Sequence, residues 1–157
     1  MTDQEVLNAI DQEFGPCPRP EHFTDYTHCC ECSEHDALLR SRDRESLDLA
    51  GVGNQGWDPI CFITPEGFAY YLPALARFAL SDTDATWGWY GSQLAFHLCY
   101  TGAANVRWQY CSESQRSAIA MLLEHLIETR AQVADDEYSA DVLLQAWEIW
   151  AHTVPPN

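Results

Sequence analysis

Residues 64–75, Thr-Pro-Glu-Gly-Phe-Ala-Tyr-Tyr-Leu-Pro-Ala-Leu, predict the central helix of the fold. Thr64 is a good N-cap, and Pro65 suits the first helical position, where a missing amide N–H costs nothing. Glu66 then favours the positive end of the helix dipole. Apolar side chains recur at helical spacing through the segment, namely Phe68, Tyr71, Leu72, Leu75, Phe78 and Ala79. We therefore expect a buried helix that begins at residue 65 and ends near residue 80.

Similar patterns on both sides of this segment predict further helices. Thr2 and Glu5 form a capping-box pattern at the start of the first helix, and the prolines of residues 15–20 end it. Ser112 and Gln115 repeat the capping box before a long helix. The other expected helices cover about 31–42, part of 87–100, and about 139–152.

The segments between these helices read as loops. Residues 43–58 are expected to be loop, 102–110 a linker, and 135–137 an acidic turn. The chain has 157 residues and is 46% hydrophobic, which fits one packed domain. The prediction is a mainly α, single-domain bundle of about six helices with long loops, spanning 1–157 with a core from about 3 to 152.

The charge of the chain is strongly negative. Asp and Glu number 24 against 8 basic residues, which gives −16, and every basic residue is Arg. The absence of Lys excludes Schiff-base chemistry and a P-loop. The scarcity of basic residues argues against nucleic acid as a ligand, because phosphate binding needs basic patches. A surface of this charge would instead attract a basic protein partner.

The sequence also bears on location. No apolar run approaches the roughly 18 residues that a membrane span needs. The acidic N-terminus, Met-Thr-Asp-Gln-Glu, does not have the pattern of a signal peptide, so we expect a cytoplasmic protein. The seven Cys residues are then expected to be reduced. The sequence does not predict an oligomeric state.

The densest group of reactive side chains is residues 28–35, His-Cys-Cys-Glu-Cys-Ser-Glu-His. Cys29 and Cys32 have the two-residue gap that lets two thiolates reach one metal ion. Cys32 and His35 repeat that gap, and His28 is adjacent. The spacing predicts a structural Zn²⁺ site that uses Cys29, Cys32, His35 and His28.

Two alternatives to zinc remain open for this group. A structural Zn²⁺ has four ligands, and the sequence contains no second matching pair, so Cys17 and His22 are the nearest further contributors. The cysteines could instead be reduced and buried as small hydrophobic side chains. Alternatively, Cys29 and Cys32 could form a redox-active or disulfide-linked pair.

A resemblance to a known family rests on three motifs. They are Cys29-x-Glu31-Cys32-x-Glu34, the helix Thr64-Pro65-Glu66-Gly67-Phe68-Ala69-Tyr70-Tyr71-Leu72-Pro73-Ala74, and the late helix that begins Ser112-Glu113-Ser114-Gln115. Over about residues 5–130 the chain resembles a family of small bacterial proteins that is catalogued as a domain of unknown function. Gly67 departs from the Ala that is more usual in the family. The resemblance implies a bacterial source and a mainly helical domain, and it supplies no activity.

Two aromatic residues near the end of the chain are candidates for partner binding. Trp147 and Trp150 lie three residues apart on the last expected helix, so they share a face. If that face is not covered by the rest of the domain, it would form a strong protein-binding patch, because Trp anchors interfaces.

Two classes of function are compatible with these patterns. The first is a non-enzymatic acidic interaction protein, such as an immunity or antitoxin-type inhibitor of a basic partner. Its support is the charge, the small size and the lack of a complete catalytic constellation. The second is a small zinc-binding protein or metal-dependent enzyme that uses the Cys29, Cys32 and His35 group. We favour the first and expect no catalytic residues.

Overall fold

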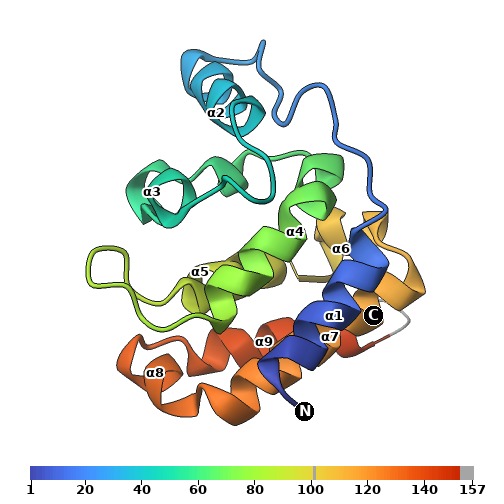
Figure 1. Ribbon diagram of the computed structural model, residues 1–157, viewed down its shortest axis with the longest axis vertical. Helices are drawn as coiled ribbons and strands as arrows, with labels where there is room; N and C mark the ends of the chain where they lie inside the picture. The colour runs from blue at the N-terminus through green and yellow to red at the C-terminus, as the bar shows by residue number, and fades with distance from the viewer. Residues whose placement is uncertain (101, 153–157) are drawn as a thin grey trace.

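Helix α4 (Pro65–Leu80) runs through the middle of the molecule, as Figure 1 shows. The predicted cap is present, because the Thr64 side chain accepts the amide N–H of Gly67 at 3.1 Å. The helix continues through Pro73, and twelve of its sixteen residues are buried. Four helices pack against it: α1 (Asp3–Phe14), α5 (Tyr90–Cys99), α6 (Val106–Tyr110) and α7 (Glu113–Thr129). The expected central helix is therefore confirmed.

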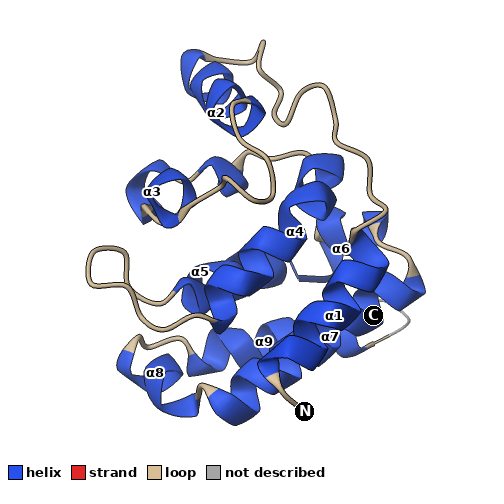
Figure 2. Ribbon diagram, viewed as in Figure 1, coloured by secondary structure: helices blue, strands red, loops and turns tan. Residues whose placement is uncertain are grey.

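The computed structural model describes residues 1–100 and 102–152, and these contain helices and loops without a strand (Figure 2). The remaining α-helices are α2 (Cys30–Arg40), α3 (Leu49–Val52), α8 (Ala131–Asp136) and α9 (Ala140–Ala151). Three 3₁₀ turns are η1 (Gln55–Trp57), η2 (Pro59–Cys61) and η3 (Gly102–Ala104). The mainly α domain with six longer helices is confirmed, and both predicted capping boxes are present.

The short helices α3, α6 and α8 lie where the sequence predicts loops or a turn. Asp48 caps α3, and Asn105 caps α6 inside the predicted linker 102–110. The acidic residues expected to form a turn at 135–137 instead lie at the end of α8. Helices of four to six residues are not stable by propensity, so tertiary packing and capping decide them.

Helix α2 and helix α3 lie at one end of the molecule, beyond the bundle of α1, α4, α5, α7 and α9 (Figure 1). The segment before α2 is tied to the start of α4, because Thr24 and Ile63 form an antiparallel bridge. Phe23 is fully buried, and its carbonyl accepts the N–H of Thr64 at 2.7 Å. A Cβ at position 67 would lie 2.9 Å from side-chain atoms of Phe23 and Ile63, so this close approach favours Gly67.

No helix in the described part of the chain has the length and apolar character that crossing a bilayer requires.

Candidate metal and thiol centre

The side chain of Asp36 fixes α2 to the segment before it. One of its carboxylate oxygens accepts the N–H groups of Phe23 at 2.6 Å and Thr24 at 3.3 Å. The other lies 2.7 Å from Nδ1 of His22. Burial disfavours the carboxylate, but the hydrogen bonds from His22 and from the two amides outweigh it, so the pKa of Asp36 lies below its ordinary value. Thr24 adds a hydrogen bond of 2.6 Å to the carbonyl of Cys32. The start of α2 is therefore held by the fold.

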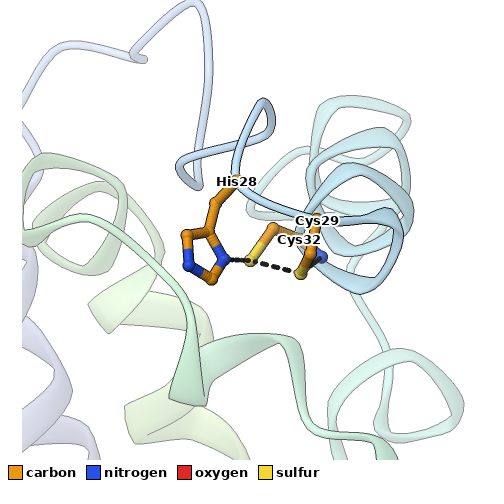
Figure 3. Close-up of side chains that lie close together, drawn as sticks. All are labelled: His28, Cys29 and Cys32. Carbon is orange, nitrogen blue, oxygen red and sulfur yellow. Dashed lines mark hydrogen bonds between the residues drawn. The ribbon is translucent and has the colours of Figure 1, made fainter.

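His28, Cys29 and Cys32 meet at the first turn of α2, and we call these three residues the α2 cluster (Figure 3). The two Sγ atoms lie 3.3 Å apart, and Nδ1 of His28 lies 3.8 Å from Sγ of Cys32. One donor atom from each residue lies within 4.8 Å of the other two. His28 and Cys29 are exposed, whereas Cys32 is buried. Three of the predicted zinc ligands are therefore side by side.

Cys29 is the N-cap of α2, and this position changes its acidity. Its Sγ accepts the amide N–H of Cys32 at 3.4 Å. This amide, together with His28 and the Cys32 thiol, lowers the pKa of Cys29 to about 7. The neighbouring Cys29 and burial raise the pKa of Cys32, and Cys29 raises that of His28. The cluster therefore favours a thiolate on Cys29 and a protonated thiol on Cys32.

His35, which the spacing assigned to the zinc site, lies elsewhere. It is fully buried, with its ring 4.7 Å from the ring of Trp57 and 4.9 Å from that of Phe62, centre to centre. Its Nε2 lies 3.4 Å from the carboxylate of Glu31. His35 therefore packs between α2 and the segment of η1 and η2, which supplies Trp57 and Phe62. The structure does not bring it into the α2 cluster.

Cys17 and His22, the two further contributors, are also engaged away from the cluster. Sγ of Cys17 accepts a hydrogen bond of 3.4 Å from Gln115 on α7, and burial raises its pKa. His22 contacts Asp36 and stacks on Tyr26 with ring centroids 3.8 Å apart. A four-ligand site within residues 1–100 and 102–152 is therefore not present at α2, and the α2 cluster comprises three donors.

A second group of possible ligands lies outside residues 28–35. Asp58, Cys61 and His97, which we call the Asp58 cluster, also place one donor atom each within 4.8 Å of the others. Asp58 precedes η2, and His97 lies 39 residues later on α5. Only the contact between η2 and α5 unites them, so no spacing in the sequence could have shown the group. The sequence predicted a helix only within part of residues 87–100, where His97 lies.

Both oxygens of the Asp58 carboxylate are hydrogen-bonded to protein donors. Its Oδ2 lies 2.7 Å from Nε2 of His97 and from Nε2 of Gln93. Its Oδ1 accepts the amide N–H of Ile60 at 2.9 Å. Asp58 and His97 are both buried. These hydrogen bonds fasten the η2 turn to α5, which gives the pair a structural role without any ion.

Cys61 is the accessible member of the Asp58 cluster. Partial burial of the thiol and the nearby Asp58 carboxylate raise its pKa to about 11. It lines two cavities of about 310 and 260 Å³, each of which also contacts Phe96. The guanidinium of Arg107 lines the smaller cavity and donates to the carbonyls of His97 and Ile60 at 3.2 and 2.6 Å.

The two tryptophans of α9 do not form an open patch. Trp150 is 1% exposed, and its Nε1 donates to the carbonyl of Leu98 at 2.9 Å. Trp147 is partly buried and packs against the core, and both residues line a cavity of about 330 Å³ between α7 and α9. Packing of α9 on α5 covers Trp150, so the condition for a protein-binding patch is not met at that residue.

Comparison with known proteins gives the family of this chain. The model of a family of unknown function, DUF6714, matches residues 2–154. The chain therefore belongs to that family. No match was found among curated proteins or among solved structures.

Proposed function

We propose that this member of the family binds one Zn²⁺ ion at the α2 cluster and uses its acidic surface to bind a basic protein partner. The convergence of His28 Nδ1 and the sulfurs of Cys29 and Cys32 supports the zinc part of the proposal. Imidazole nitrogen and thiolate sulfur are the donors that zinc prefers. With Zn–S bonds of about 2.3 Å in tetrahedral geometry, two sulfurs lie roughly 3.8 Å apart. The observed 3.3 Å requires only a small side-chain adjustment.

The proposed ion has three ligands from this chain. Closed structural sites have four protein ligands, whereas three ligands leave a position for water or for a partner's side chain. Because His28 and Cys29 are exposed, water or a partner's side chain could reach this open position. Zinc here would stabilise the first turn of α2, to which all three ligands belong or are adjacent.

Metal analysis of the full chain, purified reduced and without a His-tag, tests the zinc proposal. We expect about one equivalent of zinc in the wild type, and loss of most of it in Cys29→Ser and Cys32→Ser. Cys30→Ser and Cys61→Ser are matched controls, because Cys30 is adjacent but outside the cluster and Cys61 belongs to the Asp58 cluster. Less than about a tenth of an equivalent in the wild type would overturn the proposal.

The distribution of charge supports the second part of the proposal. Six of the eight arginines donate side-chain hydrogen bonds within the protein, mostly to backbone carbonyls: Arg19, Arg44, Arg77, Arg107, Arg116 and Arg130. Among the residues described, the Asp3–Arg130 pair is the one salt bridge between an arginine and a carboxylate. Most of the 24 carboxylates are therefore not neutralised by an arginine. Such a surface attracts positively charged proteins and would suit an immunity or antitoxin-type inhibitor.

Co-expression with each protein encoded beside its gene tests the partner proposal. We expect a stable complex with one basic protein, whose Kd rises steeply with salt because exposed charges are screened. Absence of any complex, or a Kd that does not change between low and high salt, would count against it.

A further inference from the structure

We propose that Cys29 and Cys32 are also a thiol–disulfide exchange pair, in which Cys29 attacks a low-molecular-weight disulfide and Cys32 resolves the mixed disulfide. The exchange itself does not need a metal. Its consequence, release of the ion when both sulfurs are joined, rests on the proposed zinc site.

The spacing of the two sulfurs is the first support. Their separation of 3.3 Å is longer than a disulfide bond of about 2.05 Å and shorter than the roughly 3.8 Å of two zinc-bound sulfurs. Small rotations of the two side chains therefore lead from one arrangement to the other. The two sulfurs need to approach each other by roughly 1.2 Å to reach bonding distance.

The difference in accessibility assigns the two roles. Cys29 is exposed, so a small disulfide can reach its sulfur, whereas Cys32 is 6% exposed. A thiolate is the attacking species in exchange, and Cys29 Sγ already accepts an amide N–H at the start of a helix. The buried Cys32 is not accessible to a small disulfide in solution, but its sulfur can attack the neighbouring sulfur of Cys29.

The fold holds this pair in place. The carbonyl of Cys32 accepts the Thr24 hydroxyl at 2.6 Å, and Asp36 one turn later accepts two amides of the preceding segment. Because these contacts fix the first turn of α2 on the segment before it, the spacing of the sulfurs belongs to the folded state. A flexible peptide with the same residues would lack this restraint.

Two other exposed thiols compete with the pair. Cys30 follows Cys29 directly, but its side chain is outside the α2 cluster. Cys61 lies beside the Asp58 carboxylate, which opposes formation of a thiolate. We therefore expect the intramolecular disulfide to join residues 29 and 32.

The reaction is balanced in two steps with glutathione disulfide as oxidant. The Cys29 thiolate attacks one sulfur of the oxidant, forms a protein–glutathione bond, and releases one glutathione thiolate. Cys32 then loses its proton to solvent or to the released thiolate and attacks the sulfur of Cys29. The second glutathione thiolate leaves as the intramolecular disulfide forms. The protein loses two electrons and two protons, and one glutathione disulfide becomes two glutathione thiols.

The test uses the full chain, reduced, freed of metal with a chelator, and treated with glutathione disulfide. Intact mass and peptide mapping should show loss of two hydrogen atoms and a bond between residues 29 and 32. Cys32→Ser should stop at the glutathione adduct on Cys29, and Cys29→Ser should give neither product at that site. Cys30→Ser should behave as the wild type, which excludes a bond through Cys30.

Several outcomes would overturn the inference. They are a wild-type protein that stays reduced, one that accumulates the mixed disulfide, or one whose disulfide involves Cys30 or Cys61. Zinc content is measured separately on the reduced protein. A chain that forms the 29–32 disulfide but binds no zinc refutes the proposed zinc site alone, and one that binds zinc but forms no disulfide refutes the exchange alone.

Discussion

The α2 cluster and the Asp58 cluster each contain a histidine and at least one cysteine, yet the pKa values of one thiol from each, Cys29 and Cys61, shift in opposite directions. The pKa of Cys29 is lowered to about 7, whereas that of Cys61 is raised to about 11. Cys29 caps a helix and accepts an amide N–H, whereas Cys61 lies beside a buried carboxylate. The burial, hydrogen bonds and charges around each thiol therefore shift its pKa, although both groups contain histidine and cysteine.

The two clusters differ also in how far their polar groups are already satisfied. Asp58 accepts three hydrogen bonds from the protein, and these link η2 to α5. In the α2 cluster the sulfurs contact mainly each other, one amide and His28. The first arrangement serves stability, and the second leaves donor atoms free for a metal or an oxidant.

The largest expected effect comes from breaking the Asp58 cluster. Asp58→Ala removes the acceptor of His97 and of the amide of Ile60 and one of the two acceptors of Gln93, and we expect the free energy of unfolding to fall by about 4 kcal/mol. Urea denaturation measures this. Asp82→Ala, an exposed carboxylate, should change it by less than about 0.5 kcal/mol. If both variants lose a similarly small free energy of unfolding, the hydrogen bonds of Asp58 do not stabilise the fold.

The next largest effect on stability is expected from removing the hydrogen bonds of Asp36, which hold the segment before α2 against that helix. Asp36→Ala removes the acceptor of two amides and of His22, and we expect a loss of about 2 kcal/mol near neutral pH. Glu34→Ala, on the exposed side of the same helix, is the control.

The same variant has a defined pH dependence. Because the pKa of Asp36 is lower in the folded state, its stabilisation is fully present above its ordinary value of 3.8. It is lost as the pH falls through the lower folded value. The stability difference between wild type and Asp36→Ala should therefore shrink on acidification in chemical denaturation. A difference that grows at low pH would show that Asp36 is not stabilised as a carboxylate.

The reactivity of the two exposed thiols gives a third prediction, for the reduced, metal-free protein. At pH 7.5 the thiolate fraction of Cys29 exceeds that of Cys61 by roughly 10³, and the lower nucleophilicity of the more acidic thiol reduces this to roughly 10–100-fold in rate. The rate at Cys29 should rise with pH to a midpoint near 7. Iodoacetamide labelling with peptide mapping measures both rates. Equal alkylation rates at Cys29 and Cys61 would show that the two clusters do not give their thiols different reactivity.

The smallest expected effect comes from His28. It contributes to the low pKa of Cys29 after the amide of Cys32, so His28→Ala should slow alkylation of Cys29 below pH 7 by roughly two- to threefold. Tyr26→Ala, an exposed neighbouring aromatic residue, should leave the rate unchanged. If His28→Ala speeds the reaction, the histidine shields the thiol and does not activate it.

Local chemistry in the sequence predicted the longer helices well. Thr2, Thr64 and Ser112 each cap a helix as expected, because a cap needs only residues that are adjacent in the chain. The gap between Cys29 and Cys32 likewise placed two sulfurs together. The same kind of local spacing wrongly predicted that His35 joins the two sulfurs. His35 packs instead against Trp57 and Phe62, which come from another part of the chain.

The sequence by itself determined the all-α class, the main helices, the negative charge and the pairing of Cys29 with Cys32, since all of these depend on composition or on contacts between near neighbours. Only the tertiary structure decided that His35 and Trp150 are buried and that Asp58 meets His97 across 39 residues. These outcomes depend on which helix faces pack together, and a periodic apolar pattern does not specify its partner.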